Sequence, residues 1–243
     1  MNITPIKTSI FREGQDLFSF LTKYLPPLLS GTIVVITSKI VALAQRRTVV
    51  ARTEKEKENI IRAESDYAIK TPYAWLTIKD DDVMPSAGVD ESNADGKIIL
   101  LPKNCMRTAS EIRHKLCRHY GIKNLGVLIT DSRTLPLRAG TIGMALGYAG
   151  FRGIKDYRSK RDLFGRAFRI TRVDLADSLA AAAVCTMGEG KECQPLAIIT
   201  DAPVTFCVRS PKRELHIPIH DDMYAPLFYR ALQHKKQPVK KIT

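Results

Sequence analysis

The sequence predicts a mixed α/β fold, and two observations lead to this class. Short apolar runs bounded by polar and turn residues, such as 33–36 and 125–129, are typical of strands buried on both faces. A longer Ala-rich stretch at 174–187 predicts a helix. With 243 residues, the chain can bury a full core as one large domain or two modest ones.

The individual elements follow from hydrophobic period and from the residues that stop each run. Strands are predicted at 1–10 (with a loop), 31–36, 73–78, 97–101, 125–129, 167–173, 195–200 and 204–208. Helices are predicted at 17–25, where Pro26 and Pro27 end the pattern, at 53–70, where charges alternate, and at 174–187. A further helix is predicted from a capping box at 108–111 to about residue 120.

Several connecting stretches have their own signals. Asp80, Asp81 and Asp82 point in different directions along the chain, which favours a solvated turn over a metal site. Small residues at 141–150 permit close backbone approach. Residues 156–166 predict a polar loop rich in donors, and a basic, Pro-containing tail begins at 211.

The strand at 125–129 is the element around which the chemistry is expected. It leads directly into Asp131 and Ser132, and buried strands of mixed sheets present their first polar side chains at the carboxyl end, where ligands bind. A second acidic stretch at 88–93 is expected to meet Asp131. Together they predict a divalent metal bound to a nucleotide phosphate.

The junction after strand 31–36 has two interpretations. Thr37, Ser38 and Lys39 place hydroxyls and an ammonium where free backbone N–H groups suit an anion. Thr37 or Ser38 could equally cap the helix that follows. The residue types alone do not distinguish an anion-binding junction from a helix cap. Glu189, between glycines at a predicted helix C-terminus, is opposed by the helix dipole unless a cation compensates, which hints at a ligand.

The composition limits the classes of binding partner that we expect for this protein. The net charge of +13 favours anionic partners, but the sequence has few aromatics and no common nucleic-acid-binding motif, which argues against specific nucleic-acid binding. Five scattered cysteines form no C-x-x-C pair and suggest neither a zinc site nor a disulfide framework. Without a signal segment or a membrane-length apolar run, the expectation is a reduced, cytoplasmic protein that makes no membrane contact.

Several segments together resemble one family, the coenzyme F420-0:L-glutamate ligases (F420 gamma-glutamyl ligases) and their relatives proposed for folate metabolism. The likeness spans most of residues 1–200 in consistent order, and its least common element is Ala-Gly-x-Asp-Glu-Ser-Asn at 87–93. The other matching segments are 34–41, 100–102, 129–132, 156–158, 162–166, 173–183 and 187–190.

The resemblance implies an F420 gamma-glutamyl ligase-like fold of the α+β kind, with largely antiparallel sheets and flanking helices. We expect this ligase domain over residues 1–210, with room for two subdomains, and a basic C-terminal tail over 211–243. The resemblance also implies a homodimer. The implied activity couples GTP cleavage to a γ-linked amide between a carboxylate acceptor and L-glutamate, with Mg²⁺ or Mn²⁺, through an acyl phosphate.

The resemblance assigns the family's site roles to the residues at matching positions of this chain. By the resemblance, Asp90 and Asp131 would hold one metal, while Ser132 and Glu189 would hold the second. Oxygen ligands of this kind suit Mg²⁺ or Mn²⁺. The residues that would line the nucleotide, with the segment from 187 to 194, are Ser38, Lys39, Asn93, Met187, Gly188 and Gly190.

Arginines would bind the anionic acceptor, a pterin- or deazaflavin-type molecule, and L-glutamate, because arginine pairs bidentately with carboxylates. The arginines considered are Arg133, Arg138, Arg158 and Arg161, of which Arg138 is predicted to act in catalysis with Asp90 and Asp131. The alternative for each arginine is surface solvation, and for each aspartate a turn or cap.

The chain also departs from the family pattern. Leu43 stands where the family commonly has a second lysine, so either Arg46 or Arg47 replaces its charge or the nucleotide contacts differ. Thr141 stands where a glutamine is frequent. After Asp131 the chain reads Ser-Arg-Thr-Leu-Pro, which favours a folate-type acceptor while leaving F420-0 open. Two other hypotheses remain: a non-catalytic nucleotide- or metabolite-binding relative, and a basic nucleic-acid-associated protein.

Overall fold

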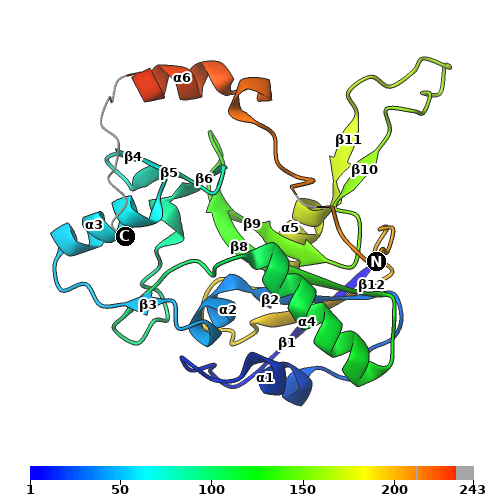
Figure 1. Cartoon of the computed structure of the whole chain (residues 1–243), viewed down its shortest axis with the longest axis horizontal. Coiled ribbons are helices and arrows are strands. Elements are labelled where there is room, and N and C mark those ends of the chain that lie inside the picture. The colour runs from blue at the N-terminus through cyan, green and yellow to red at the C-terminus, as the bar shows by residue number, and fades with distance from the viewer. Residues whose placement is uncertain (212, 234–243) are drawn as a thin grey trace. The chain divides into compact units, whose positions relative to one another are not determined.

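The computed structural model describes residues 1–211 and 213–233 (Figure 1). The chain divides into two compact units, residues 1–48 with 101–214 and residues 49–100 with 215–243. The mixed α/β class is confirmed. The predicted ligase domain over 1–210 and tail over 211–243 stay predictions, and residues 212 and 234–243 of that tail lie outside the described residues.

A five-stranded sheet forms the centre of the first unit, in the order β1-β12-β2-β8-β9 (Figure 1). Its strands are β1 (Asn2–Ile6), β2 (Thr32–Thr37), β8 (Leu125–Thr134), β9 (Thr141–Ala149) and β12 (Leu196–Thr200). Only β2 and β8 run parallel, and the other neighbours are antiparallel. The expectation of largely antiparallel sheets is therefore confirmed.

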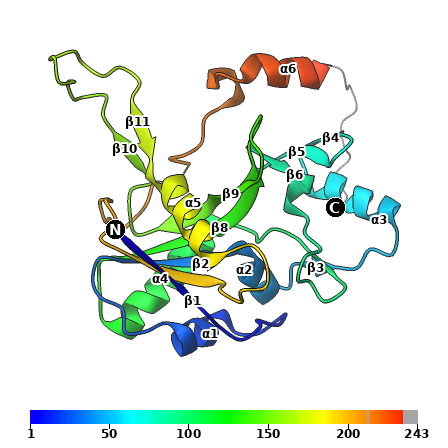
Figure 2. The same cartoon turned by 180° about the vertical axis from the view of Figure 1, so that it is seen from behind.

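Helices cover both faces of this sheet. On one face lie α1 (Leu17–Tyr24), α2 (Ser38–Ala44) and α4 (Cys105–Tyr120), whose apolar side chains share a core with Val34, Ile36 and Val127. Figures 1 and 2 show α5 (Leu175–Met187) on the opposite face from α4. Alternate residues of β2 and β8 are buried on each side, which is why these strands read as continuous apolar runs.

A bulge in β9 explains its small residues. The register with β8 shifts after Ile129, which pairs with Gly147, whereas Thr130 pairs with Ala145, so Leu146 is the extra residue. The shift turns Gly143 and Gly147 to opposite faces. A Cβ on Gly143 would lie 2.4 Å from the Ala180 carbonyl of α5, and one on Gly147 would lie 2.4 Å from the Cys105 backbone of α4. The predicted close approach is confirmed.

The N-terminus of α1 offers a test of local stabilisation. Hydrogen bonds from Ser19 to the Asp16 carboxylate (backbone N–H to Oδ1, 2.7 Å) hold the pKa of Asp16 below its ordinary 3.8. Because the folded-state pKa is lowered, this stabilisation is complete above the unfolded pKa and is lost as pH falls through the folded pKa. We expect Asp16→Ala to lower the free energy of unfolding by about 1 kcal/mol at neutral pH.

The same substitution should cost less once the carboxyl is protonated, because the neutral carboxyl oxygen is a weaker acceptor than the carboxylate. Asp16→Asn is the matched control, because its amide oxygen still caps the helix but does not titrate. Thermal melts of the three proteins across the acidic range measure the effect. A constant difference between wild type and Asp16→Ala at every pH would contradict it.

Four elements differ from the sequence-based predictions. Helix α4 begins at Cys105, after Asn104, so the capping-box prediction at 108–111 is wrong; Thr108 lies inside the helix and donates its backbone N–H to the Asn104 carbonyl at 2.9 Å. The predicted helix over 53–70 ends earlier, because residues 67–70 form a strand.

Two predicted strands are also wrong in extent. The strand predicted at 167–173 is only β11 (Arg172–Asp174), paired with β10 (Ile154–Asp156) in a hairpin. The strand predicted at 204–208 is a single bridge between Phe206 and Phe151. Both stretches have strand-like residues but pair with another backbone segment over only part of their length, because strand pairing is a tertiary property.

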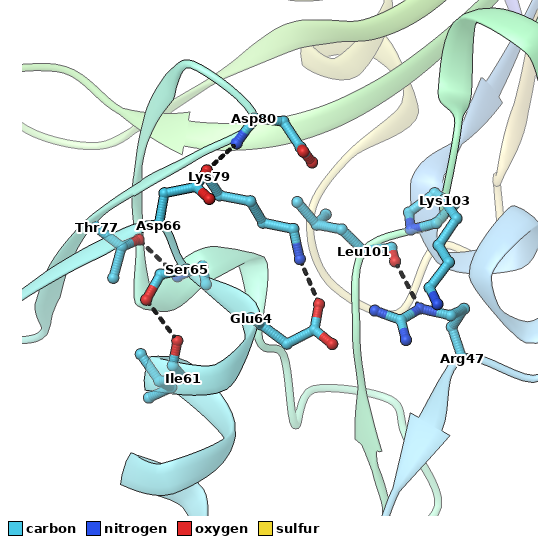
Figure 3. A network of polar contacts seen from close by, with 12 residues as sticks. Arg47, Ile61, Glu64, Ser65, Asp66, Thr77, Lys79, Asp80, Leu101 and Lys103 are labelled. Atoms are coloured by element: carbon cyan, nitrogen blue, oxygen red, sulfur yellow. Dashed lines mark hydrogen bonds and ion pairs between the residues drawn. The ribbon is translucent and has the colours of Figure 1, made fainter. Parts of the chain in front are cut away.

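The second unit contains α3 (Glu54–Glu64) and the antiparallel strands β4 (Tyr67–Lys70), β5 (Trp75–Lys79) and β6 (Asp82–Pro85). Ile61, Ala68 and Trp75 form its small core. Figure 3 shows Lys79 pointing to Glu64, with which it forms an ion pair. The predicted turn at Asp80 and Asp81 is confirmed, since both have positive φ between β5 and β6.

The remaining short elements are β3 (Thr48–Val49), which pairs with β7 (Ile98–Ile99), the 3-10 turns Ser86–Gly88 and Ile219–Asp221, and α6 (Ala225–Gln233). Within the described part of the chain, no helix combines the length and apolar character needed to cross a membrane.

Candidate functional site

The parallel pairing of β2 and β8 brings two polar segments to one edge of the sheet. Thr37 and Thr130 are partners in the register, so Ser38 and Asp131, the next residues, emerge side by side. The Ser38 hydroxyl donates to Asp131 Oδ1 at 2.8 Å. Because Ser38 is buried, this bond fixes one oxygen of a carboxylate that is itself partly exposed.

The junction after β2 resolves the two interpretations of its hydroxyls. Thr37 is the N-cap of α2, and its Oγ1 accepts the Lys39 backbone N–H at 3.2 Å. The capping interpretation is therefore correct for Thr37. Ser38 instead binds Asp131, and Lys39 is partly exposed on the first turn of α2.

The opposite side of the same strand end carries a second pair of oxygens. Successive strand residues face opposite sides, so Ser132 turns to the α5 side while Asp131 turns to the α2 side. The Ser132 hydroxyl donates to Glu189 Oε1. Glu189 follows the end of α5 between Gly188, which has φ 83°, and Gly190, and it is exposed as predicted.

These side chains have the chemistry of a magnesium-type site. Carboxylate and hydroxyl oxygens are hard ligands, and Mg²⁺ usually binds through one or two carboxylates, with waters and phosphate oxygens completing its shell. Nowhere in the described residues do three or more His, Cys, Asp or Glu side chains gather into a metal-holding cluster. The oxygens at this edge are of the ligand type that Mg²⁺ prefers.

Asp90 belongs to the second unit and has the hydrogen bonding of a turn aspartate. Its backbone pairs with Ile99, and its carboxylate accepts the Ser92 backbone N–H at 2.7 Å and the Ser92 hydroxyl at 3.0 Å. Asn93, three residues on, has a positive φ of 54°. The predictions that Asp90 shares a metal with Asp131 and that Asn93 lines the nucleotide stay predictions.

The four candidate arginines come from two places in the first unit. Arg133 is buried on β8, and Arg138 is exposed in the connection to β9. Arg158 holds Asp156, with Nε at 3.0 and 2.9 Å from its two oxygens, and lowers the pKa of Asp156 to about 2. Arg161 donates to the Gly165 carbonyl at 2.6 Å. Two of the four thus serve the β10–β11 hairpin itself.

The structure also describes Leu43, at the position of the family's second lysine, and the two arginines considered as replacements for its charge. Leu43 packs partly buried against the core of the first unit. Arg47 donates from Nε to the Leu101 carbonyl at 3.1 Å (Figure 3), and the Arg46 guanidinium lies over the Gly14 backbone. Both arginines therefore have structural neighbours that the sequence did not indicate.

One supporting residue was missed. Asp177 Oδ1 accepts the Ala145 backbone N–H at 2.8 Å and so ties the β9 bulge to the first turn of α5. An aspartate in the first helical turn is ordinarily explained by the helix dipole, so its sequence position gave no signal of a cross-element contact.

Comparisons with known proteins identify the family of the chain. The family model for F420-0:Gamma-glutamyl ligase matches residues 5–201. A Coenzyme F420:L-glutamate ligase of Methanococcus maripaludis is 35% identical over 212 residues, covering 80% of this chain and 84% of its own length. Proteins of the same name from Methanocaldococcus jannaschii (30% identical, covering 92% and 96%) and Methanothermobacter thermautotrophicus (34%, covering 72% and 77%) are also similar.

The fold defines a mixed α/β protein whose central sheet carries hydroxyl and carboxylate oxygens at one edge. More specifically, the chain belongs to the F420-0:gamma-glutamyl ligase family. The resemblance stated from the sequence motifs is confirmed.

Proposed function

We propose that this protein is a γ-glutamyl ligase that uses GTP and a divalent metal to join L-glutamate to a carboxylate acceptor. The observation that carries the proposal is the pair of oxygen groups at the end of β8, Ser38 with Asp131 and Ser132 with Glu189. They lie within the segment that matches the ligase family. Relatives that share about a third of its residues are named coenzyme F420:L-glutamate ligases.

The reaction proceeds in two balanced steps. A carboxylate oxygen of the acceptor attacks the γ-phosphorus of GTP, GDP leaves, and an acyl phosphate forms. The uncharged amine of L-glutamate then attacks the acyl carbon, phosphate leaves with the bonding electron pair, and the nitrogen loses a proton. A Mg²⁺ or Mn²⁺ ion held by these oxygens would supply positive charge to neutralise the phosphates, and the transfer itself depends mainly on positioning.

The chain's own residues supply that positioning. Asp131 is held by Ser38 on one side of the strand, and Glu189 is held by Ser132 on the other, so each carboxylate has one fixed oxygen. We assign the first metal to Asp131 and Asp90, and the second to Ser132 and Glu189. Lys39, Asn93 and the segment from Met187 to Gly190 are assigned to the nucleotide, and Arg138 to the acidic substrates.

The acceptor proposed first is F420-0, because the similar relatives carry the name of that cofactor. The departures after Asp131 keep a folate-type acceptor as the second arm of the test. The purified protein is incubated with L-glutamate, GTP or ATP, Mg²⁺ or Mn²⁺, and F420-0 or tetrahydrofolate. We expect GDP and a product heavier by one glutamyl residue, both requiring L-glutamate.

Nucleotide binding without phosphate release in every combination would overturn the ligase proposal and favour the non-catalytic relative. Equal activity with ATP would remove the preference for GTP. Light scattering of the same preparation tests the expected homodimer.

The second metal position has its own test. Glu189→Gln keeps the size and the hydrogen-bond acceptor for Ser132 but removes the charge that a cation needs. We expect the Mg²⁺ concentration for half-maximal activity to rise about tenfold, since a carboxylate contributes most of its ion affinity through charge. Mn²⁺ binding measured by electron paramagnetic resonance gives a readout besides turnover.

The matched control is Glu111→Gln on α4, an exposed glutamate that pairs with Arg107 one helical turn away. This pair is solvent-exposed and should contribute little. An unchanged Mg²⁺ dependence in Glu189→Gln would remove Glu189 from the metal site.

A further inference from the structure

A strongly basic arm projects from the first unit. The arm, residues 154–173, contains β10, most of β11 and the loop between them, and Figures 1 and 2 show it extending beyond the N-terminal end of α5. It has seven basic and two acidic side chains, a net charge of +5 in a chain whose total is +13. All seven basic side chains are exposed. A large share of the positive charge is therefore concentrated on one projecting element.

The arm is an ordered two-stranded ribbon. Beyond the β10–β11 pairing, the Tyr157 backbone N–H donates to the Thr171 carbonyl at 3.1 Å, and the Phe168 backbone N–H donates to the Lys160 carbonyl at 3.0 Å. The rings of Tyr157 and Phe168 pack edge to face, with their centroids 6.1 Å apart. Backbone pairing thus continues from the base of the arm towards its tip, and it fixes the order in which the charges are presented.

The tip of the arm is also ordered, and it exposes two large apolar side chains. Asp162 Oδ1 accepts the backbone N–H groups of Phe164 at 2.9 Å and of Arg166 at 2.8 Å, which closes a tight turn. Leu163 and Phe164, on this turn, are 98% and 95% exposed. Nothing in the described part of the chain covers them. Because large apolar side chains gain free energy when they leave water, the tip indicates a contact with a partner.

Most basic side chains of the arm keep their donors for such a partner. Arg158 is bound to Asp156, and Arg161 donates to a backbone carbonyl at the tip. The other five form no ion pair with any residue that the structure describes, and they are Lys155, Lys160, Arg166, Arg169 and Arg172. Guanidinium and ammonium groups with open donors bind phosphate oxygens, arginine bidentately.

The spacing of these charges distinguishes between anionic partners. Arg172 lies at the base of the arm and Arg166 near its tip, up to about 20 Å apart along an extended strand. A membrane touched by the tip would attract only charges within a Debye length, about 8 Å at physiological salt. A duplex has phosphates along its whole length, and its grooves admit a two-stranded ribbon. Charges along the whole arm therefore favour a nucleic-acid duplex.

We propose that the arm binds double-stranded DNA without sequence preference. The five basic side chains contact phosphates on both sides of a groove, and Leu163 and Phe164 insert between neighbouring base pairs. Apolar side chains inserted in this way unstack a base step and bend the duplex. The binding is independent of base sequence, since the chain has none of the common nucleic-acid-binding motifs. It lies beyond the ligase reaction and requires neither GTP nor a metal ion.

Fluorescence anisotropy of a short labelled DNA duplex, titrated with the full-length protein at several salt concentrations, measures the binding. Each phosphate contact contributes about −0.9 to the slope of log K against log salt, so five contacts predict a slope of about −4.5. A duplex with a central mismatch should bind more tightly than the matched duplex, because a mismatched step is easier to unstack. A slope near zero would overturn the proposal.

Charge variants locate the contact. Arg166→Gln combined with Arg169→Gln should reduce the slope by about two and weaken binding by about tenfold or more. Arg12→Gln combined with Arg118→Gln removes the same charge from exposed positions before α1 and on α4, and it should bind as wild type does. An equal loss in both double variants would show that only the net charge matters and would overturn the assignment to the arm. Thermal melts check that both are folded.

A tip variant tests the inserted side chains separately. Leu163→Ser combined with Phe164→Ser keeps every charge, so the salt slope should stay the same while the preference for the mismatched duplex disappears. A preference that survives would overturn the insertion. Two further results would assign the arm to another partner and overturn the proposal. One is tighter binding to phosphatidylserine–phosphatidylcholine vesicles than to DNA, and the other is an oligomeric state that changes in the tip variant, measured by light scattering. None of these results depends on turnover.

Discussion

Asp131→Asn is expected to lower L-glutamate-dependent GTP cleavage by about a thousandfold, equivalent to about 4 kcal/mol of lost transition-state stabilisation. Asparagine preserves the shape of the side chain and can still accept the Ser38 hydroxyl, which lies 2.8 Å from the carboxylate. The loss then reports the negative charge, because a neutral amide holds a divalent ion poorly. Initial rates of GDP release at saturating Mg²⁺ measure it.

Asp201→Asn is the matched control for this substitution. Asp201 follows β12 at the opposite end of the sheet from Ser38, is exposed, and has a positive φ of 53° that asparagine also tolerates. Its activity should equal that of the wild type. If Asp131→Asn retains more than a tenth of wild-type turnover, Asp131 is not the ligand that the ligase proposal requires.

Gly143→Ala is expected to produce the largest loss of stability, about 3 kcal/mol, by overpacking the contact between β9 and α5. The new Cβ would lie 2.4 Å from the Ala180 carbonyl and 2.6 Å from Val184, so the helix would have to move away from the sheet. Activity should fall as well, since α5 leads into the Gly188–Gly190 segment. Urea unfolding followed by circular dichroism measures the free energy of unfolding.

Gly31→Ala distinguishes steric overlap from backbone preference. A Cβ there meets nothing within 4 Å, although φ is 91°. The expected cost is about 1 kcal/mol, from the unfavourable backbone conformation alone. Equal costs at Gly31 and Gly143 would show that the close packing of α5 on β9 is not what Gly143 is needed for.

Local sequence patterns were sufficient to predict the strands and helices that have the clearest hydrophobic pattern. The run at 125–129 identified β8, and the Ala-rich stretch located α5 from its cap at Asp174 to Met187. The motif at 87–93 and the residues around Asp131 identified the family from the sequence alone. A strand buried on both faces and a helix cap each depend on residues that are adjacent in the sequence. Both features can therefore be predicted from the sequence.

Elements whose existence depends on a distant partner could not be predicted in the same way. The stretch at 204–208 has strand-like residues but forms only one bridge to Phe151, and β11 is much shorter than its composition suggested. The Leu146 bulge, which turns Gly143 towards α5 and Gly147 towards α4, also leaves no local mark. Strand pairing and register depend on which backbone comes alongside.

The sequence by itself determined that an acidic strand end, a hydroxyl-rich junction and a glycine-flanked glutamate exist in this protein, and which family they belong to. Only the tertiary structure decided that Ser38 binds Asp131 across 93 residues of chain, that Ser132 binds Glu189, and that Arg172 faces Asp156 at the base of a hairpin. The physical reason is that side-chain chemistry is local, whereas the contacts it makes are set by the pairing of strands and the packing of helices that are distant in sequence.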